Sequence, residues 1–301
     1  MKKILTAAVV LGLIVSVSIA QASMTDTTFS FTTINVKTDT FTQLLGINNN
    51  GEIAGYHGSG VAGHPNQGFT LVPPSSFTVE NFPGSVQTQV IGINGSGNTD
   101  GFYVDNSGVN HGFIKTGSNY KTVDFPDPTS VLTQLLSLNN AGVAAGYWQN
   151  GAGVQFPFMV QGTKFTSLDS MLPSNTSAQA TGVNNSSEIS GFFVDSSGVN
   201  HGFLLVKGVV TVLDFPGSTF TQALGLNNLN EVVGTYNDAK GNTHGFLYDA
   251  TAKVYESVND SSGVDTTVVN GINDEGQIVG FYVDGTGNTD GFVGHIVRCA
   301  N

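Results

Sequence analysis

Beyond its first two dozen residues, the chain alternates short apolar runs with clusters of Gly, Asn, Asp and Ser. The pattern is clearest between residues 245 and 283, where β-branched and aromatic residues gather in four runs, at 245–248, 253–258, 266–272 and 277–283. Runs of this length, separated by turn-forming residues, predict four antiparallel strands. No segment in this part of the chain keeps a 3.6-residue period, so we expect negligible helix content.

The same pattern returns every 43 to 46 residues. In each copy an Asn ends a short apolar run, usually as Gly-[Ile/Leu/Val]-Asn, and a Gly follows seven residues later. The six Asn residues are Asn48, Asn94, Asn139, Asn184, Asn227 and Asn273. The six Gly residues are Gly55, Gly101, Gly146, Gly191, Gly234 and Gly280. A fixed period of this size indicates a repeat architecture.

The position three residues after each Asn predicts the turn that joins two strands. It is occupied by Gly51, Gly97, Gly142, Ser187, Asn230 and Gly276. Gly and Asn adopt a positive φ at little cost, which fits a type I turn followed by a left-handed residue. We expect the most strained of these turns at Ser187.

The Gly seven residues after each Asn lies within a predicted strand, where Gly normally weakens the sheet. Its recurrence in all six copies predicts that a backbone or a large side chain approaches closely. We expect that neighbour to be an aromatic layer of the adjoining repeat. The candidate residues are Phe69, Phe113, Phe158, Phe203, Phe246 and Phe292.

Four strands in a period near 45 residues predict one blade of a β-propeller, and six copies predict six blades in one domain, residues 23–301. The run 29–36 resembles a return strand whose partner is missing at the N-terminus, and 291–297 supplies such a partner at the C-terminus. We expect the two to pair and close the ring, which removes two exposed sheet edges. An open solenoid would instead need distinct capping repeats.

Residues 1–22 have the pattern of a signal peptide. Lys2 and Lys3 precede an apolar stretch at 4–19 and a small-residue cleavage site at 20–22. We expect export to the extracellular space or the periplasm, with no membrane insertion after signal removal, because no later segment has 18 consecutive apolar residues. Cys299 is the only cysteine, so no disulfide forms within one chain. We expect a monomer.

The charge of the chain limits its partners. The formal net charge is −12, and removal of the signal would make it −14. Such a surface repels phosphate backbones, so we expect no nucleic-acid partner. We expect no cofactor, although carboxylates leave room for weak Ca²⁺ binding. No dedicated metal site is predicted, because the Asp-containing loops lack the spacing of an EF-hand.

One copy, residues 214–246, reads D-F-P-G…T-Q-A-L-G-L-N-N…V-V-G-T-Y…H-G-F. This pattern resembles the HAF-type extracellular repeat, and the similarity covers about residues 29 to 297. The chain departs from the family by having Gly where the His-Ala-Phe signature has Ala, and it lacks the C-terminal sorting helix of some relatives. The resemblance implies an exported, propeller-like repeat protein, and it implies no reaction and no catalytic residues.

An Asp and a His recur together in several copies, for example Asp105 with His111 and Asp195 with His201. An Asp–His pair suits acid–base chemistry, yet a catalytic pair is needed only once. We therefore interpret these residues as an Asx turn followed by a strand-entry residue. A second repeated column consists of Gln43, Gln89, Gln134, Gln179 and Gln222, with Val268 in the last copy. These glutamines either face a central channel or pair with strand edges between blades.

Positions that break the repeat are better candidates for a ligand site. In the third copy, Tyr147 and the only Trp, Trp148, precede a loop that has lost the Asp and the His. In the first copy, a loop longer by two residues contains His57 and His64. Drift in a tolerant loop is the alternative to function. An exposed Trp148 stacking on a sugar ring is the specific form of this hypothesis.

The sequence contains no nucleophile elbow, zinc-protease motif, P-loop or dinucleotide fingerprint. We therefore predict a non-catalytic binding or scaffold module for a glycan or another cell-envelope component, such as an envelope protein. The alternative is a propeller hydrolase or lyase with its site on the asymmetric loops of blades one and three.

Overall fold

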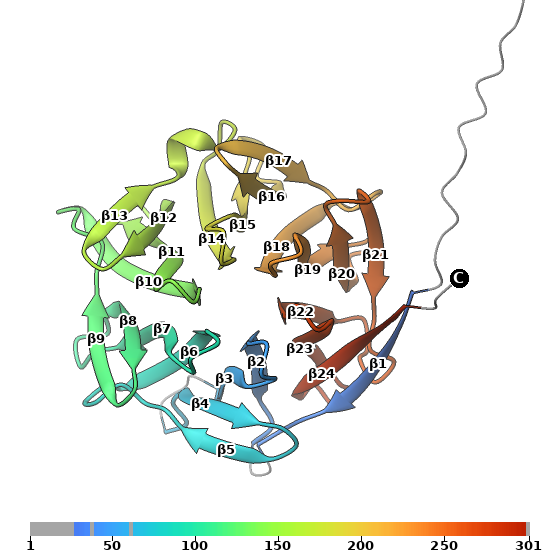
Figure 1. Cartoon of the computed structure of the whole chain (residues 1–301), viewed down its shortest axis with the longest axis horizontal. Coiled ribbons are helices and arrows are strands. Elements are labelled where there is room, and N and C mark those ends of the chain that lie inside the picture. The colour runs from blue at the N-terminus through green and yellow to red at the C-terminus, as the bar shows by residue number, and fades with distance from the viewer. Residues whose placement is uncertain (1–26, 37–38, 60–62, 299–301) are drawn as a thin grey trace, which may run out of the picture.

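The computed structural model describes residues 27–36, 39–59 and 63–298. These residues form six four-stranded antiparallel sheets arranged as blades around a central channel, which confirms the predicted six-bladed β-propeller (Figure 1). The only helical element in these ranges is a 3₁₀ turn, η1 (Asp169–Met171). None of the described helices is long and apolar enough to cross a membrane. The predicted signal at 1–22 and Cys299 lie outside the described residues.

Each blade begins at the channel and ends at the rim. Blade one contains β2 (Thr42–Ile47), β3 (Ile53–His57), β4 (Gln67–Val72) and β5 (Ser76–Val79). Blade two contains β6 (Gln87–Ile93), β7 (Thr99–Val104), β8 (Asn110–Thr116) and β9 (Asn119–Val123). Blade three contains β10 (Ser130–Leu138), β11 (Val143–Asn150), β12 (Gln155–Gln161) and β13 (Lys164–Ser167).

The second half of the ring follows the same order. Blade four contains β14 (Ser177–Val183), β15 (Ile189–Val194), β16 (Asn200–Val206) and β17 (Val209–Leu213). Blade five contains β18 (Phe220–Leu226), β19 (Glu231–Asn237), β20 (Thr243–Asp249) and β21 (Val254–Val258). Blade six contains β22 (Thr267–Ile272), β23 (Gln277–Val283) and β24 (Thr289–Arg298), and its outer strand is β1 (Thr27–Thr33) from the other end of the chain.

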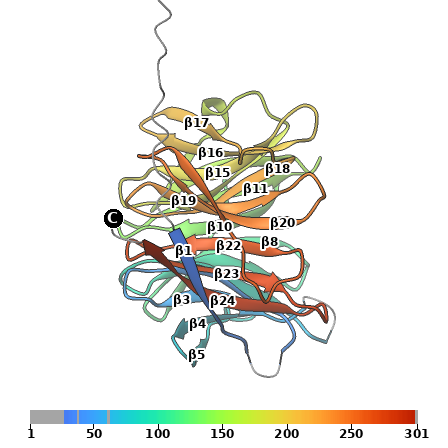
Figure 2. The ribbon, with the colours of Figure 1, turned by 90° about the vertical axis from the view of Figure 1, so that its right-hand side faces the viewer.

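The ring closes by pairing of β1 with β24, as predicted. The two strands are antiparallel, with Phe31 opposite Gly294, and Figure 2 shows them side by side. The rings of Phe31 and Phe292 meet edge to face, with centroids 5.2 Å apart. The first and last described strands share one sheet, so the ring of blades is closed. Two neighbouring blades can therefore separate only if this sheet breaks or a second interface between blades opens.

The six turns after the conserved Asn residues have the predicted backbone. All six residues at the third position have a positive φ, including the two that are not glycine, Ser187 at 60° and Asn230 at 61°. A side chain in this region costs about 1 kcal/mol relative to Gly. The strain expected at Ser187 is therefore shared by Asn230, whose side chain tolerates this region better.

The Gly seven residues after each Asn is approached closely by backbone, as predicted, but the aromatic ring beside it does not come from the expected repeat. A Cβ atom there would lie 2.0 to 2.3 Å from a carbonyl oxygen of the inner strand of the same blade. The nearby aromatic ring also comes from the same blade, since Gly55 pairs with Phe69 and Gly234 pairs with Phe246. The expectation of an adjoining repeat's aromatic layer was wrong. The Phe of each blade is 0 to 1% exposed and lies in the core beside this Gly.

Candidate functional site

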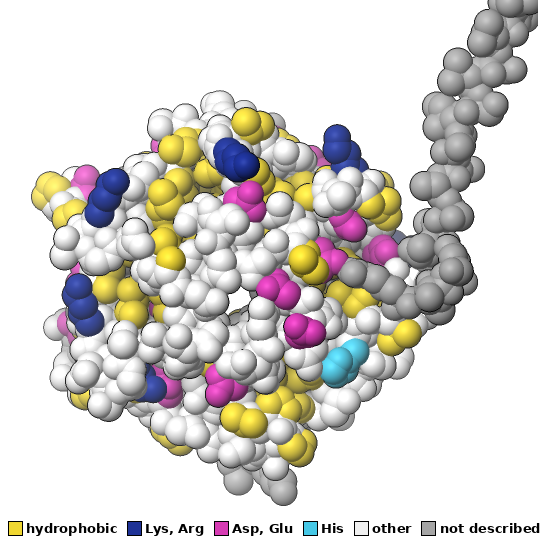
Figure 3. All heavy atoms as spheres, in the orientation of Figure 1, with side chains coloured by type: hydrophobic (Ala, Val, Ile, Leu, Met, Phe, Trp, Pro, Cys, Tyr) yellow, Lys and Arg dark blue, Asp and Glu magenta, His cyan; other side chains and the backbone are white. Residues whose placement is uncertain are grey.

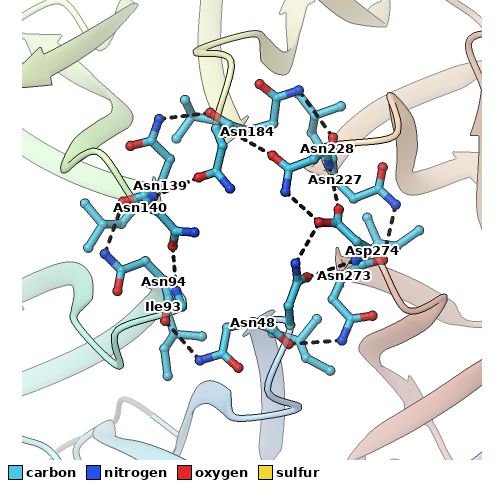
Figure 4. Close-up of a pocket in the computed structure, with 18 residues that line it drawn as sticks. Asn48, Ile93, Asn94, Asn139, Asn140, Asn184, Asn227, Asn228, Asn273 and Asp274 are labelled. Atoms are coloured by element: carbon cyan, nitrogen blue, oxygen red, sulfur yellow. Dashed lines mark hydrogen bonds between the residues drawn. The ribbon is translucent and has the colours of Figure 1, made fainter.

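The conserved asparagines form a closed hydrogen-bonded ring at one end of the channel. The side-chain Nδ2 of each Asn donates to the main-chain carbonyl of the corresponding Asn in the next blade, at 2.9 to 3.3 Å. Asn273 closes the circle by donating to Asn48 (Figure 4). Each Oδ1 also accepts hydrogen bonds from two N–H groups of its own turn, as Asn48 does from Asn50 and Glu52. These buried amides are structural.

The neighbouring residues form a second, more exposed layer at this asparagine end. Asp274 is its only carboxylate, and it accepts hydrogen bonds from the amides of Asn49 and Asn228. Burial raises the pKa of Asp274, but the hydrogen bonds from Asn228 and Asn49 outweigh that effect and leave the pKa below its usual value. Acidic side chains approach the centre of the face in Figure 3, whereas basic ones stand nearer its rim.

The other end of the channel is shaped by a β-bulge in each inner strand. The register of every inner strand shifts at the residue three before the conserved Asn. A bulge re-aims side chains, and these six residues all line a cavity of about 260 Å³. They are Leu45, Ile91, Leu136, Thr181, Leu224 and Asn270. Two residues earlier in the inner strands of blades one to five comes the glutamine column, and blade six has Val268 there.

The glutamines satisfy both structural alternatives left open by the sequence. Gln43, Gln89, Gln134 and Gln179 line the cavity at what we call the glutamine end of the channel. Some also bond between blades, because Gln222 donates to Asn200 at 3.0 Å and Gln179 donates to Gln155 at 2.9 Å. The column therefore faces the channel and joins adjacent blades.

Between blades four and five lies a hollow of about 240 Å³, formed by the start of β16 and the loop 214–219. His201 Nδ1 lies 2.9 Å from a carboxylate oxygen of Asp214, and its Nε2 lies 3.5 Å from Asp195. The imidazole stacks on Phe193, with ring centroids 5.2 Å apart. The side chain of Asp214 is half exposed, so one side of its carboxylate remains open to solvent. We call this the interblade pocket.

The predicted Asx turns are present in these loops. The Oδ1 atom of Asp105 accepts hydrogen bonds from the N–H groups of Ser107 and Val109, and Asp195 repeats the arrangement. The hydrogen bond from Val109 is the main reason why the pKa of Asp105 lies below its usual value. The other oxygen of each Asp approaches the His, so the pair is both a turn cap and a support for the imidazole.

In blade one, two histidines converge on a single carboxylate. His57 Nδ1 lies 2.9 Å and His64 Nε2 lies 3.1 Å from the same oxygen of Asp39, which is 2% exposed. His64 Nδ1 lies 3.2 Å from the hydroxyl of Ser59. The structure thus brings together the two histidines that the sequence singled out, and adds two partners that it did not. Across residues 27–36, 39–59 and 63–298, no His, Cys, Asp or Glu cluster has the arrangement of a metal site.

In blade three, Trp148 does not stand free. It is 8% exposed and stacks between Phe125 and Phe156, at 5.2 and 4.4 Å between ring centroids. The expectation of an exposed Trp148 was therefore wrong, because aromatic rings cover both faces of the indole. Tyr147 is also buried, and its hydroxyl donates to Gln134 at 2.8 Å beside the channel. The structure does not bring these two side chains to the blade-one histidines.

A repeated pattern in the sequence indicates that position 148 is a packing position. The residue nine after each conserved Asn is aromatic or His in all six copies, namely His57, Tyr103, Trp148, Phe193, Tyr236 and Tyr282. Tyr103, Phe193 and Tyr236 each stack on the His of their own blade, at 5.1 to 5.2 Å. Phe156 replaces that His in blade three. Trp148 is thus a variant of a repeated packing position and not a break in the pattern.

Comparison with known proteins supports the fold. No family model matches the sequence, and no curated protein matches it. Among solved structures, AofleA from Arthrobotrys oligospora is 10% identical, covers 91% of both chains and gives a TM-score of 0.57. SapL1 lectin, solved in complex with alpha methyl fucoside, is 11% identical over 87% of this chain and 97% of its own, with a TM-score of 0.55.

A third structure, the lectin of Aleuria aurantia, is described as a six-bladed β-propeller with a novel fucose recognition mode. It is 10% identical over 87% of this chain and 93% of its own, with a TM-score of 0.53. At these identities the likeness concerns the fold alone.

Proposed function

We propose that this protein is a glycan-binding propeller, and that the interblade pocket is where it contacts sugar. The observation that carries the proposal is the half-exposed carboxylate of Asp214, held in place by His201 at the edge of a 240 Å³ hollow. A fixed carboxylate accepts hydrogen bonds from sugar hydroxyls. Pro216 and Phe220 line the same hollow and offer apolar surface to the C–H face of a sugar ring.

Two further observations support this function. The similar propellers SapL1 and the Aleuria aurantia lectin are, by their own descriptions, fucose-binding proteins. The His–carboxylate pair also recurs between blades two and three, where His111 Nδ1 lies 2.9 Å from Asp124. Several weak sites on one ring would bind a branched or surface-bound glycan with an avidity above that of any single site.

A glycan array, followed by titration with the strongest ligand, tests the proposal. Asp214→Asn removes the charge at the pocket with little change in shape, and we expect binding to weaken at least fivefold. Asp249→Asn makes the same charge change at the far end of β20 and should leave binding unaltered. Absence of any signal for the wild-type protein, or equal affinity in the two variants, would remove the interblade pocket from consideration.

The proposal includes export and kinship with the HAF-type repeats. An exported binding module acts at the cell envelope or outside it, where polysaccharides and envelope proteins are its accessible partners. Expression of the full-length chain in a bacterium, with mass spectrometry of the secreted product, tests this part. A mature protein beginning near residue 23 is expected, and recovery of only the uncleaved chain inside the cell would contradict it.

A second candidate, a hydrolase, is favoured by one specific arrangement in blade one. Ser59, His64 and Asp39 are connected in the order hydroxyl, imidazole, carboxylate, with 3.2 and 3.1 Å between the interacting atoms. This is the order in which a base activates a serine nucleophile. Hydrolysis of p-nitrophenyl esters should then fall to background in Ser59→Ala, whereas activity that survives this change would exclude the arrangement as its source.

A further inference from the structure

The side chains that line the glutamine end of the channel are all uncharged. The cavity of about 260 Å³ has a wall of bulge residues, four of them aliphatic, and a rim of four glutamines. Tyr56 and Phe102 complete the lining. This neutral lining disfavours charged ligands, because an ion here would lose hydration without a counter-charge.

The rim has hydrogen-bonding capacity that the protein does not use. Within the described part of the chain, the side chain of Gln89 makes no hydrogen bond. Gln43 accepts from the Tyr56 hydroxyl at 2.8 Å, which leaves its amide NH₂ group available. Gln179 donates to Gln155 at 2.9 Å, which leaves its carbonyl oxygen available. Unused amide donors and carbonyl acceptors of these glutamines therefore line the same cavity as the aliphatic bulge residues.

The arrangement is not six-fold. Blades one to four contribute the lining glutamines, whereas the amide of Gln222 is bonded to Asn200 and blade six has Val268 in this position. The bulge ring is also uneven, since Thr181 and Asn270 interrupt its aliphatic members and donate to backbone carbonyls. A ligand at the centre therefore meets one polar side and one less polar side, which favours a single orientation.

We propose that the glutamine end of the channel binds one neutral sugar residue, a hexose or a deoxyhexose, per chain. Such a ring has hydroxyls around its edge for the amides and C–H groups for the aliphatic bulge residues. Pockets for drug-sized ligands span roughly 300 to 1,000 Å³, so 260 Å³ is suited to a single sugar residue. The site is separate from the interblade pocket and does not depend on it.

Isothermal titration with the methyl α-glycosides of glucose, mannose, galactose and fucose tests this site, with glucuronate and glucosamine as charged counterparts. We expect at least one neutral glycoside to bind at a single channel site per chain, with an affinity that does not change in Asp214→Asn, and the charged sugars to bind at this site at least tenfold more weakly. Gln89→Leu removes the unused amide and should weaken binding at least fivefold. Leu136→Phe fills the cavity and should weaken it more than tenfold.

Asp214→Asn is the control that separates the two sites, because it alters the interblade pocket and leaves the channel intact. Circular dichroism confirms that each variant is folded, and the side-chain amide resonance that Gln89→Leu removes from the NMR spectrum should shift on addition of glycoside to the wild type. Binding that is insensitive to both channel variants, no binding of any neutral glycoside, or equal binding of the charged sugars would each overturn the proposal. Loss of binding in Asp214→Asn alone would assign sugar recognition to the interblade pocket only.

Discussion

Asn273 donates a hydrogen bond from its side-chain amide to the main-chain carbonyl of Asn48, 225 residues earlier in the chain, at 3.0 Å. The same contact joins every other pair of adjacent blades, where the two residues are only 43 to 46 positions apart. One residue type at one position in the repeat therefore stabilises both the local turn and the closure of the whole ring. Its two functions can be separated by mutation.

Asn273→Asp keeps an oxygen that can accept from the turn N–H groups but replaces the donor with a carboxylate oxygen that faces the carbonyl of Asn48. We expect the free energy of unfolding to fall by about 1 to 3 kcal/mol, as for a buried hydrogen bond left unmade. Urea denaturation measures it. Asn185→Asp is the matched control, since within the described ranges the Asn185 side chain bonds only through its oxygen, which accepts from the N–H of Asn140. Equal stability of the two variants would show that the amide ring contributes nothing to closure.

Gly101→Ala should be strongly destabilising, because its Cβ would lie 2.0 Å from the carbonyl oxygen of Gln89 within the same sheet. Neither strand can move without breaking the ladder, so we expect a loss of about 3 kcal/mol or more. Gly108→Ala is the comparison. Gly108 has a φ of +83° but open space around it, so only backbone strain of about 1 kcal/mol applies. Thermal unfolding would rank the two, and the reverse order would contradict the steric explanation.

Asp100 makes the stability of the protein depend on pH. Its side chain is fully buried, one carboxyl oxygen has no hydrogen-bond partner among the described residues, and burial raises its pKa to about 8. Between pH 4 and 8 the folded state keeps a proton that the unfolded state releases, so the free energy of unfolding falls as the pH rises. The slope approaches about 1.4 kcal/mol per pH unit.

Asp100→Asn keeps the shape of the side chain and removes the titration. Urea unfolding of both proteins from pH 5 to 8 should show the wild type losing stability relative to the variant across this range. Blade one has Ala54 at the corresponding position, which makes Asp100→Ala a second test. A difference between wild type and variant that does not change with pH would exclude a protonated Asp100.

Trp148→Ala should destabilise the fold and spare sugar binding. The indole is buried between Phe125 and Phe156, so its removal leaves a cavity that costs about 3 to 5 kcal/mol. Trp148→Phe keeps an aromatic ring in the stack and should lose less. Titration at a temperature where the Ala variant is folded should give wild-type affinity. A variant that is stable but binds no glycan would restore Trp148 as a ligand residue.

Period and turn chemistry predicted much of this architecture. Alternating apolar runs predicted the strands, and the recurrence of Gly, Ser or Asn three residues after each Asn predicted the six left-handed turns. The partner of Gly55 was misjudged, because spacing along the chain does not say whether the aromatic ring beside it belongs to the same blade. Trp148 was misjudged for a similar reason. Its stacking partner Phe125 lies in the connection between blades two and three, 23 residues earlier in the sequence.

The sequence by itself determined the number of blades, the strand order and the pairing of the first strand with the last, because these follow from local patterns repeated at a constant interval. Only the tertiary structure decided which polar side chains meet. The convergence of His57 and His64 on Asp39, the burial of Asp100 and the neutral cavity at the glutamine end depend on how six curved sheets converge. Small shifts such as a β-bulge aim side chains inward, and no single repeat contains the neighbours that these side chains contact.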